Sequence, residues 1–185
     1  MNTRNQILIT GPSGSGKTTL SKLLDGYDLD QVGYRHESDR AHLTWTLPEH
    51  LISFWLRNDD HGPKNEFLFG VSTNIRAIIR LPWFAVIIIS PAIERVLANR
   101  AVRGRDSEWE PVDRIRLTEL RRGGDGFDPV FDGGLSRFSG NFHPTHLIRY
   151  SASGPDMVAS AIRMVATPAG GNRWGRLGVH HTNLP

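Results

Sequence analysis

One octapeptide constrains this chain more than any other feature. Residues 11–18 have the sequence GPSGSGKT and fit the pattern G-x-x-x-x-G-K-[ST] in full. A short apolar run at 6–10 precedes it and predicts a buried strand, whereas leucines at 20, 23 and 24 follow it at helical spacing. A glycine-rich turn between a strand and a helix directs backbone N–H groups toward an anion. The octapeptide therefore predicts a phosphate-binding loop.

Each residue type in the octapeptide has a role in nucleotide binding. The glycines let the backbone pass close to a β-phosphate, Lys17 can reach the β- and γ-phosphates, and the Thr18 hydroxyl can ligate Mg²⁺. ATP is expected rather than GTP by default, because nothing else in the chain specifies the base. With ATP and Mg²⁺ as cofactors, the expected nucleotide-binding residues are Gly11, Ser13, Gly14, Ser15, Gly16, Lys17, Thr18 and Thr19.

Apolar runs and helical patterns alternate along the rest of the chain. Strands are predicted at 26–30, 66–71, 83–90 and 145–150, and helices at 48–57, 74–81, 90–102, 111–122 and 156–166. The run at 84–89 is apolar without interruption, which is typical of a strand buried on both faces of a parallel sheet. The pattern predicts an α/β fold of three layers with a mainly parallel sheet.

Composition excludes several classes of site. The 185 residues include no cysteine, which excludes a disulfide scaffold, a thiolate zinc site and a cysteine nucleophile. No stretch reaches the ~18 apolar residues that a membrane helix needs, and no secretory signal is visible at the N-terminus. A cytoplasmic protein without a membrane partner is therefore expected.

Arginine dominates the basic residues. Only three of the 22 basic residues are lysines, which leaves 19 arginines, and the formal net charge is +3. The planar guanidinium group suits phosphate oxygens better than an ammonium group does. Either an anionic partner or a GC-rich coding sequence explains this bias.

Four stretches together point to a family. They are the octapeptide at 11–18, YDLDQVGY at 27–34, FLFGVSTN at 67–74 and the strand and basic helix at 88–105. No N-K-x-D guanine motif is present, and the chain is too short for a second motor domain. Over roughly 6–166, the chain resembles the small P-loop kinases, which include the adenylate-, shikimate- and gluconate-kinase-like enzymes. The third strand departs from the pattern, because it ends without the aspartate that many P-loop enzymes use for the metal.

The resemblance implies a P-loop NTPase fold with an arginine-bearing lid. It places one kinase domain at 1–166, with the lid at about 100–110. A glycine-rich insertion at about 123–143 has no counterpart in the resemblance. The segment 167–185 has no periodicity that would fold it alone, and a flexible tail is expected there.

Two aspartates follow the predicted second strand. Asp28 and Asp30 are two residues apart, so their side chains would point the same way on a strand. The resemblance implies that Asp30 is catalytic and orients or deprotonates the acceptor hydroxyl, while Asp28 lies near the metal and the substrate. A solvated turn is the alternative interpretation.

Arginines follow the most apolar strand. The resemblance implies that Arg95, Arg100 and Arg103 belong to the lid and neutralise the transferring phosphoryl group. Arg100 is the best catalytic candidate among them, beside Lys17 and Asp30. A solvated basic helix face is the alternative.

The acceptor region is expected between the second and third strands. The candidate substrate residues there are Arg35 and Trp45, together with Asp28 and Asp30, and Asn74 follows the third strand. Aromatic rings beside arginines can stack a base and bind a phosphate.

These features predict an ATP-dependent phosphotransferase that moves the γ-phosphoryl group to a hydroxyl or phosphate of a nucleoside or nucleotide. One alternative is a kinase that acts on a hydroxyl of a modified base, such as hydroxymethyluracil, within DNA. Another is a nucleotide-binding regulatory module without transfer. The sequence specifies neither the acceptor nor the oligomeric state.

Overall fold

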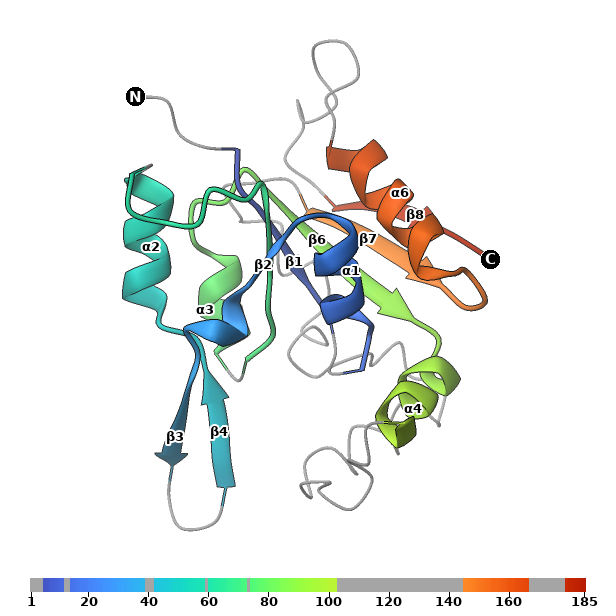
Figure 1. The fold of residues 1–185 in the computed structure, drawn as a ribbon, viewed down its shortest axis with the longest axis horizontal. Helices are drawn as coiled ribbons and strands as arrows, with labels where there is room; N and C mark the ends of the chain where they lie inside the picture. Colours follow the sequence, from blue (N-terminus) through green and yellow to red (C-terminus); the bar gives the residue numbers. More distant parts are fainter. Residues whose placement is uncertain are drawn as a thin grey trace.

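A six-stranded parallel sheet forms the centre of the molecule (Figure 1). The computed structural model describes residues 5–11, 14–38, 42–58, 60–72, 74–102, 145–166 and 179–185. The strands, in their order across the sheet, are β2 (Tyr27–Asp28), β5 (Phe67–Phe69), β1 (Ile7–Thr10), β6 (Ala85–Pro91), β7 (Thr145–Tyr150) and β8 (Val179–Asn183). The helices are α1 (Lys17–Leu23), the 3₁₀ helix η1 (Leu29–Gln31), α2 (Glu49–Arg57), α3 (Ile75–Ile79), α4 (Ile93–Val102) and α6 (Pro155–Ala166).

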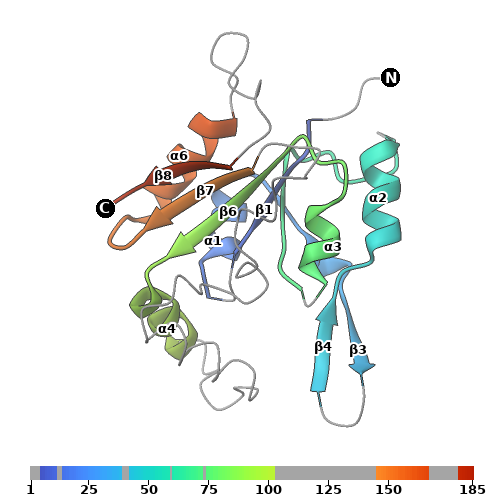
Figure 2. The ribbon, with the colours of Figure 1, turned by 180° about the vertical axis from the view of Figure 1, so that it is seen from behind.

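Helices cover both faces of this sheet (Figures 1 and 2). Side chains alternate along β1, so that Ile7 and Ile9 pack with α1 and α6, whereas Leu8 packs with α2 and α3. All three side chains are fully buried. A strand covered on both faces needs apolar side chains in both directions, which explains the unbroken apolar runs of β1 and β6. The three layers and the parallel sheet confirm the predicted α/β class.

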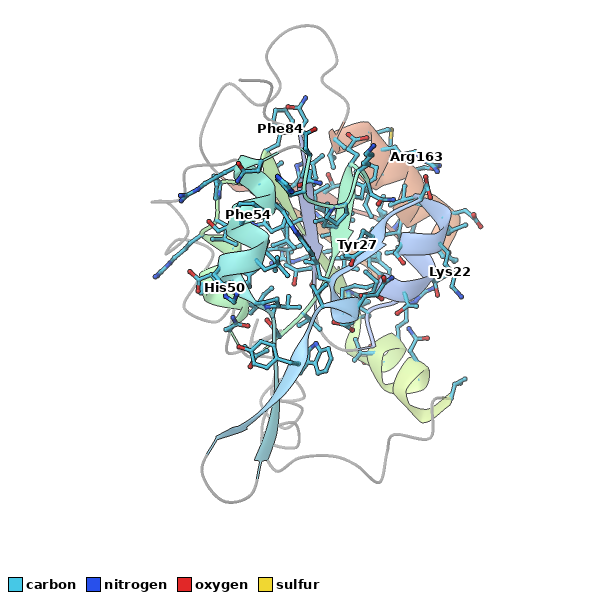
Figure 3. The ribbon with its side chains drawn as sticks, turned by 60° about the vertical axis from the view of Figure 1, so that its left-hand side comes forward. Lys22, Tyr27, His50, Phe54, Phe84 and Arg163 are labelled. Atoms are coloured by element: carbon cyan, nitrogen blue, oxygen red, sulfur yellow. The ribbon has the colours of Figure 1, made fainter. Side chains whose placement is uncertain are left out.

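Helix α1 is docked against α6 on one face. Arg163 of α6 donates a hydrogen bond from Nη2 to the Leu23 carbonyl oxygen at 2.7 Å, where α1 ends (Figure 3). Leu20 of α1 is buried in the same apolar cluster as Ile162 of α6. These contacts hold α1 in place, and its first residue, Lys17, directly follows the glycine-rich turn.

Most elements occur where the apolar patterns predict them. The strands expected at 26–30, 66–71, 83–90 and 145–150 correspond to β2, β5, β6 and β7, although β2 and β5 are shorter than expected. Helices α2, α3, α4 and α6 likewise correspond to four predicted helices. The helix expected at 111–122, the lid beyond residue 102 and the insertion at 123–143 lie outside the described residues.

Two elements differ from the prediction. Residues 179–183 form β8, which pairs in parallel with β7, so the expectation of a flexible tail is wrong for this part of 167–185. The backbone groups of β7 provide hydrogen-bond partners that no local pattern reveals. The second difference is a hairpin of β3 (Tyr34–Ser38) and β4 (His42–Thr46), which forms a separate two-stranded antiparallel sheet.

The strand order places a topological switch point at the carboxyl edge of the sheet, between β1 and β6. After β1 the chain moves toward β2 on one side, and after β6 it moves toward β7 on the other side. Because β1 and β6 are neighbours, the segments that follow them diverge, and ligands bind at such switch points in open α/β sheets. The β3–β4 hairpin and α4 both project beyond this edge (Figures 1 and 3). None of the described helices is long and apolar enough to cross a membrane.

Candidate functional site

The octapeptide at 11–18, called the glycine loop below, follows β1 at this switch point. Gly14 has φ 90° and Gly16 has φ 87°, which lie in the left-handed region that glycine adopts at little cost. At Gly11, a Cβ atom would collide with the Ile89 carbonyl oxygen and side chain in β6. The glycines therefore allow a loop that turns tightly and passes close to the neighbouring strand.

Lys17 lies across the glycine loop. Its ammonium group donates hydrogen bonds to the Gly11 carbonyl oxygen at 2.9 Å and to Ser15 Oγ at 3.4 Å. The side chain is half-buried, so its charge is held beside the loop backbone. Thr18 and Thr19, on the first turn of α1, are exposed, whereas Ser13 lies outside the described residues. A cation and a hydroxyl thus stand at one end of a glycine-rich turn.

Two side chains from elements distant in the sequence also contact the loop. Asn99 of α4 donates from Nδ2 to the Gly14 carbonyl oxygen at 2.8 Å. Tyr150, the last residue of β7, donates from its hydroxyl to the Ser15 carbonyl oxygen at 2.6 Å. Burial raises the pKa of Tyr150 to about 12, against a smaller opposing effect of the Arg95 charge. Its hydroxyl therefore remains a hydrogen-bond donor throughout the physiological pH range.

The expected lid arginines occupy different places. Arg95 donates from Nη1 to the carbonyl oxygens of Ser153, at 2.5 Å, and Ser151, at 3.4 Å, and its guanidinium carbon lies 5.4 Å from the centre of the Tyr150 ring. These contacts attach α4 to the segment after β7. Arg100 belongs to α4 and follows Asn99, and Arg103 lies outside the described residues.

Thr10 ends β1 immediately before the loop. Its side chain is fully buried, and its Oγ1 is the one buried side-chain polar atom in the described part of the chain that has no hydrogen-bond partner. An unpaired buried hydroxyl is costly, and such groups in native proteins commonly have a functional reason. A ligand atom or a water molecule that reaches the carboxyl end of β1 would find a hydroxyl there.

The two aspartates do not share a strand, so the strand on which the expected common direction of their side chains was based is not present. β2 ends at Asp28, and the Asp28 carboxylate accepts a hydrogen bond from the Asp30 backbone N–H at 3.0 Å. This local bond begins η1 and competes with strand extension, as aspartate side chains often do. The exposed Asp30 accepts from Trp45 Nε1 through Oδ1 at 3.1 Å.

Asp28 nevertheless ends β2, and Asp30 follows this strand, at the same edge of the sheet as the glycine loop. Asp28 is in register with Phe69 of β5, and Phe69 is in register with Ile9 of β1. Asp28 therefore lies two strands from β1, about 10 Å at normal strand spacing. Burial, and secondarily the Asp28 charge, raises the pKa of the adjacent Tyr27.

The other expected substrate residues belong to or support the hairpin. Arg35 of β3 and Trp45 of β4 are directly opposite each other in register. The Trp45 ring packs on Gly33, where a Cβ atom would collide with it. Asn74, in contrast, binds backbone: its Oδ1 accepts from the Leu47 N–H at 3.0 Å, and its Nδ2 donates to the Leu47 carbonyl oxygen at 2.9 Å.

Among the described residues, no group of three or more His, Asp or Glu side chains could hold a metal ion by itself. Thr18 and Asp28, the expected metal residues, follow different strands of the sheet. A nucleotide-bound Mg²⁺ usually takes only one or two protein ligands beside phosphate oxygens and water. The exposed Thr18 hydroxyl, beside the loop, is of the right chemical type for such a site.

Sequence reasoning assigned no role to Asn99, Thr10 or Tyr150. The position of Tyr150 in the sequence could have identified it as a site residue, because it ends a predicted parallel strand and thus lies at the same edge of the sheet as the loop. Asn99 follows Arg95 by four residues and shares its face of α4. No family model matches this chain, and no curated protein matches its sequence.

Proposed function

We propose that this chain is a P-loop kinase, an ATP-dependent phosphotransferase that delivers the γ-phosphoryl group to a nucleoside or nucleotide acceptor. The glycine loop carries this proposal. It combines left-handed glycines, the Lys17 ammonium group and a position after β1 at the switch point of a parallel sheet. Loops of this composition and place bind the phosphates of nucleotides.

The residues around the loop fit a Mg²⁺-nucleotide. The backbone of residues 14–16 and Lys17 would bind the β- and γ-phosphates, and the Thr18 hydroxyl would contribute a metal ligand. Bound Mg²⁺ would neutralise charge on the phosphate oxygens. The carboxylate of Asp28 lies at the same edge and can hold a metal-bound water. This arrangement needs no metal site built from protein ligands alone.

The acceptor side favours a hydroxyl. Asp30 is exposed at the carboxyl edge, at the base of the β3–β4 hairpin. In the proposed step the acceptor oxygen forms a bond to the γ-phosphorus, the bond from that phosphorus to the β–γ bridging oxygen breaks, and Asp30 accepts the hydroxyl proton. ADP and the phosphorylated acceptor are the products. A phosphate acceptor is already an anion and would be repelled by the two aspartates.

The experiment measures ATP binding and phosphoryl transfer in parallel. The acceptors are nucleosides, nucleoside monophosphates, small hydroxyl compounds and DNA that contains hydroxymethylated bases, each with γ-labelled ATP. Lys17→Ala should lose transfer and weaken ATP binding, whereas Lys22→Ala, at the other end of α1, should behave as wild type. ATP binding of wild-type strength in Lys17→Ala would refute the proposal.

Asp30→Asn separates the roles of the acidic residues. It should keep ATP affinity and lose about 10²–10⁴-fold in transfer, the usual contribution of a general base. Asp60→Asn, which changes an exposed aspartate away from the loop, is the matched control. Intact transfer in Asp30→Asn would favour a phosphate acceptor. If ATP binds but no acceptor is phosphorylated, the chain is a regulatory module, and a steep salt dependence with DNA would identify a polymer acceptor.

A further inference from the structure

Two hydrogen bonds hold consecutive carbonyl groups of the glycine loop. Asn99 donates to the Gly14 carbonyl oxygen at 2.8 Å, and Tyr150 donates to the Ser15 carbonyl oxygen at 2.6 Å. The donors come from α4 and from the end of β7, 85 and 135 residues along the chain from the carbonyls that they bind. Ser15 and Tyr150 are both buried. These contacts therefore tie the loop to two separate parts of the fold.

The planarity of the peptide bond gives these contacts a consequence. In a trans peptide, the N–H group of one residue points away from the carbonyl group of the residue before it. When Asn99 holds the Gly14 carbonyl on one side, the Ser15 N–H is directed to the opposite side. In the same way, when Tyr150 holds the Ser15 carbonyl, the Gly16 N–H points away from Tyr150. The left-handed Gly14 and Gly16 flank Ser15 and permit this geometry.

We propose that Asn99 and Tyr150 are positioning residues, which aim the Ser15 and Gly16 N–H groups at the phosphate chain of a nucleoside di- or triphosphate. The inference rests on the proposed nucleotide binding and does not require transfer. Neither side chain touches the phosphate. Each acts through a peptide group. Without the donor, this peptide group would have to reorient when the anion binds, and the cost of that reorientation would reduce the binding free energy.

Both donors are held independently of the loop. The Tyr150 ring is buried in the core, and the Arg95 guanidinium carbon lies 5.4 Å from its centre. Arg95 also bonds to the carbonyl oxygen of Ser153 at 2.5 Å. Arg95 and Asn99 are one turn apart on the same face of α4. Arg95 attaches the helix to the segment after β7, and Asn99, in the next turn, contacts the glycine loop. The two donors are thus held in place by contacts that do not involve the loop.

The test uses the full chain and two ligands, ATP and inorganic tripolyphosphate, with titration calorimetry as the binding assay. Tyr150→Phe and Asn99→Ala should each weaken both ligands about 2- to 10-fold, the range expected for the loss of one hydrogen bond between neutral groups. Asn99→Asp should weaken binding further, because it replaces the donor by an anion beside a carbonyl. Tyr34→Phe and Asn58→Ala remove the same groups elsewhere and serve as matched controls.

A second readout separates positioning from a general loss of structure. In ¹⁵N-labelled protein, tripolyphosphate should shift the Ser15 and Gly16 amide protons of the wild type downfield, and the variants should lose this shift while the other amides keep theirs. If Tyr150→Phe does not fold, Asn99→Ala still decides the matter, since Asn99 lies outside the core. Wild-type affinity and wild-type amide shifts in folded variants would overturn the inference. If the wild type binds neither ligand, both proposals fail, whereas binding without transfer overturns only the kinase.

Discussion

A substitution of Asn74 can distinguish between two roles for this residue, contact with the substrate and stabilisation of the fold. Sequence reasoning placed it beside the acceptor, yet its amide forms a pair of hydrogen bonds with the backbone of Leu47 and also accepts from Ser72 Oγ at 2.8 Å. Leu47 is fully buried between β4 and α2. Asn74 therefore connects the segment after β5 to the base of the hairpin.

The expected loss in the free energy of unfolding follows from the groups that Asn74→Ala would leave unpaired. A buried backbone group without a partner costs about 1–3 kcal/mol, and the Leu47 N–H and C=O would both lose theirs. Because Asn74 is half-buried, water can compensate part of this, and we expect a loss of about 2–4 kcal/mol. For a chain of this size the melting temperature should fall by roughly 4–16 °C.

Urea unfolding at equilibrium, followed by circular dichroism, measures the change as a shift in midpoint at constant slope. Asn58→Ala removes a surface hydrogen bond from an asparagine to the Phe54 carbonyl oxygen and should cost no more than about 0.5 kcal/mol. Asn74→Asp should fail to rescue stability, because it retains the acceptor but places an anion against the Leu47 carbonyl. A free energy of unfolding for Asn74→Ala within 0.5 kcal/mol of the wild-type value would refute this reasoning.

Two further predictions concern Trp45 and Tyr150. Trp45→Phe removes the indole N–H that binds Asp30, so kcat for transfer should fall about 3- to 10-fold while KM for ATP stays constant; parallel changes in both constants would contradict this assignment. Tyr150 has a folded-state pKa of about 12 against 10.0 for the free group, so its contribution to stability is complete below pH 10 and is lost as the pH rises toward 12. Between pH 9 and pH 11 the wild type should lose about 1 kcal/mol more unfolding free energy than Tyr150→Phe, and equal losses in urea titrations would contradict this.

Apolar periodicity predicts the core elements because burial produces that periodicity. Strand β6 packs apolar side chains on both faces, and its sequence shows this directly. The β3–β4 hairpin mixes charged and apolar residues, so its sequence has no unbroken apolar run of the kind that marks β6. Strand β8 (VHHTN) has a single aliphatic residue, and it is a strand because the edge of β7 pairs with it. Long-range pairing cannot be inferred from a local pattern.

The candidate site divides in the same way. The glycine loop is a local motif, because its function needs particular residue types at consecutive positions. The prediction that Asp28 and Asp30 share one strand is wrong, because the strand ends at Asp28, where the carboxylate accepts a hydrogen bond from the Asp30 N–H. Arg95 was expected on the transferring phosphoryl group and instead binds the backbone after β7. Asp28 and Arg95 are both close to the predicted edge, but the partner of the Asp28 carboxylate is local, whereas the partners of Arg95 were brought to it by tertiary structure.

The parallel sheet explains why the edge at which a site residue lies was easier to predict than the group to which that residue bonds. Every strand of such a sheet ends at the same edge, so Gly11, Asp28 and Tyr150 all lie at that edge, although Asp28 and Tyr150 belong to strands on opposite sides of β1. Which group bonds to which then depends on side-chain reach and on competing backbone groups. A loop with three glycines among eight residues can adopt many conformations, and glycine loses more entropy on ordering than any other residue. Asn99 and Tyr150 hold two carbonyl groups of this loop from neighbouring elements, and residues of this kind are best sought on the strands and helices that border the loop.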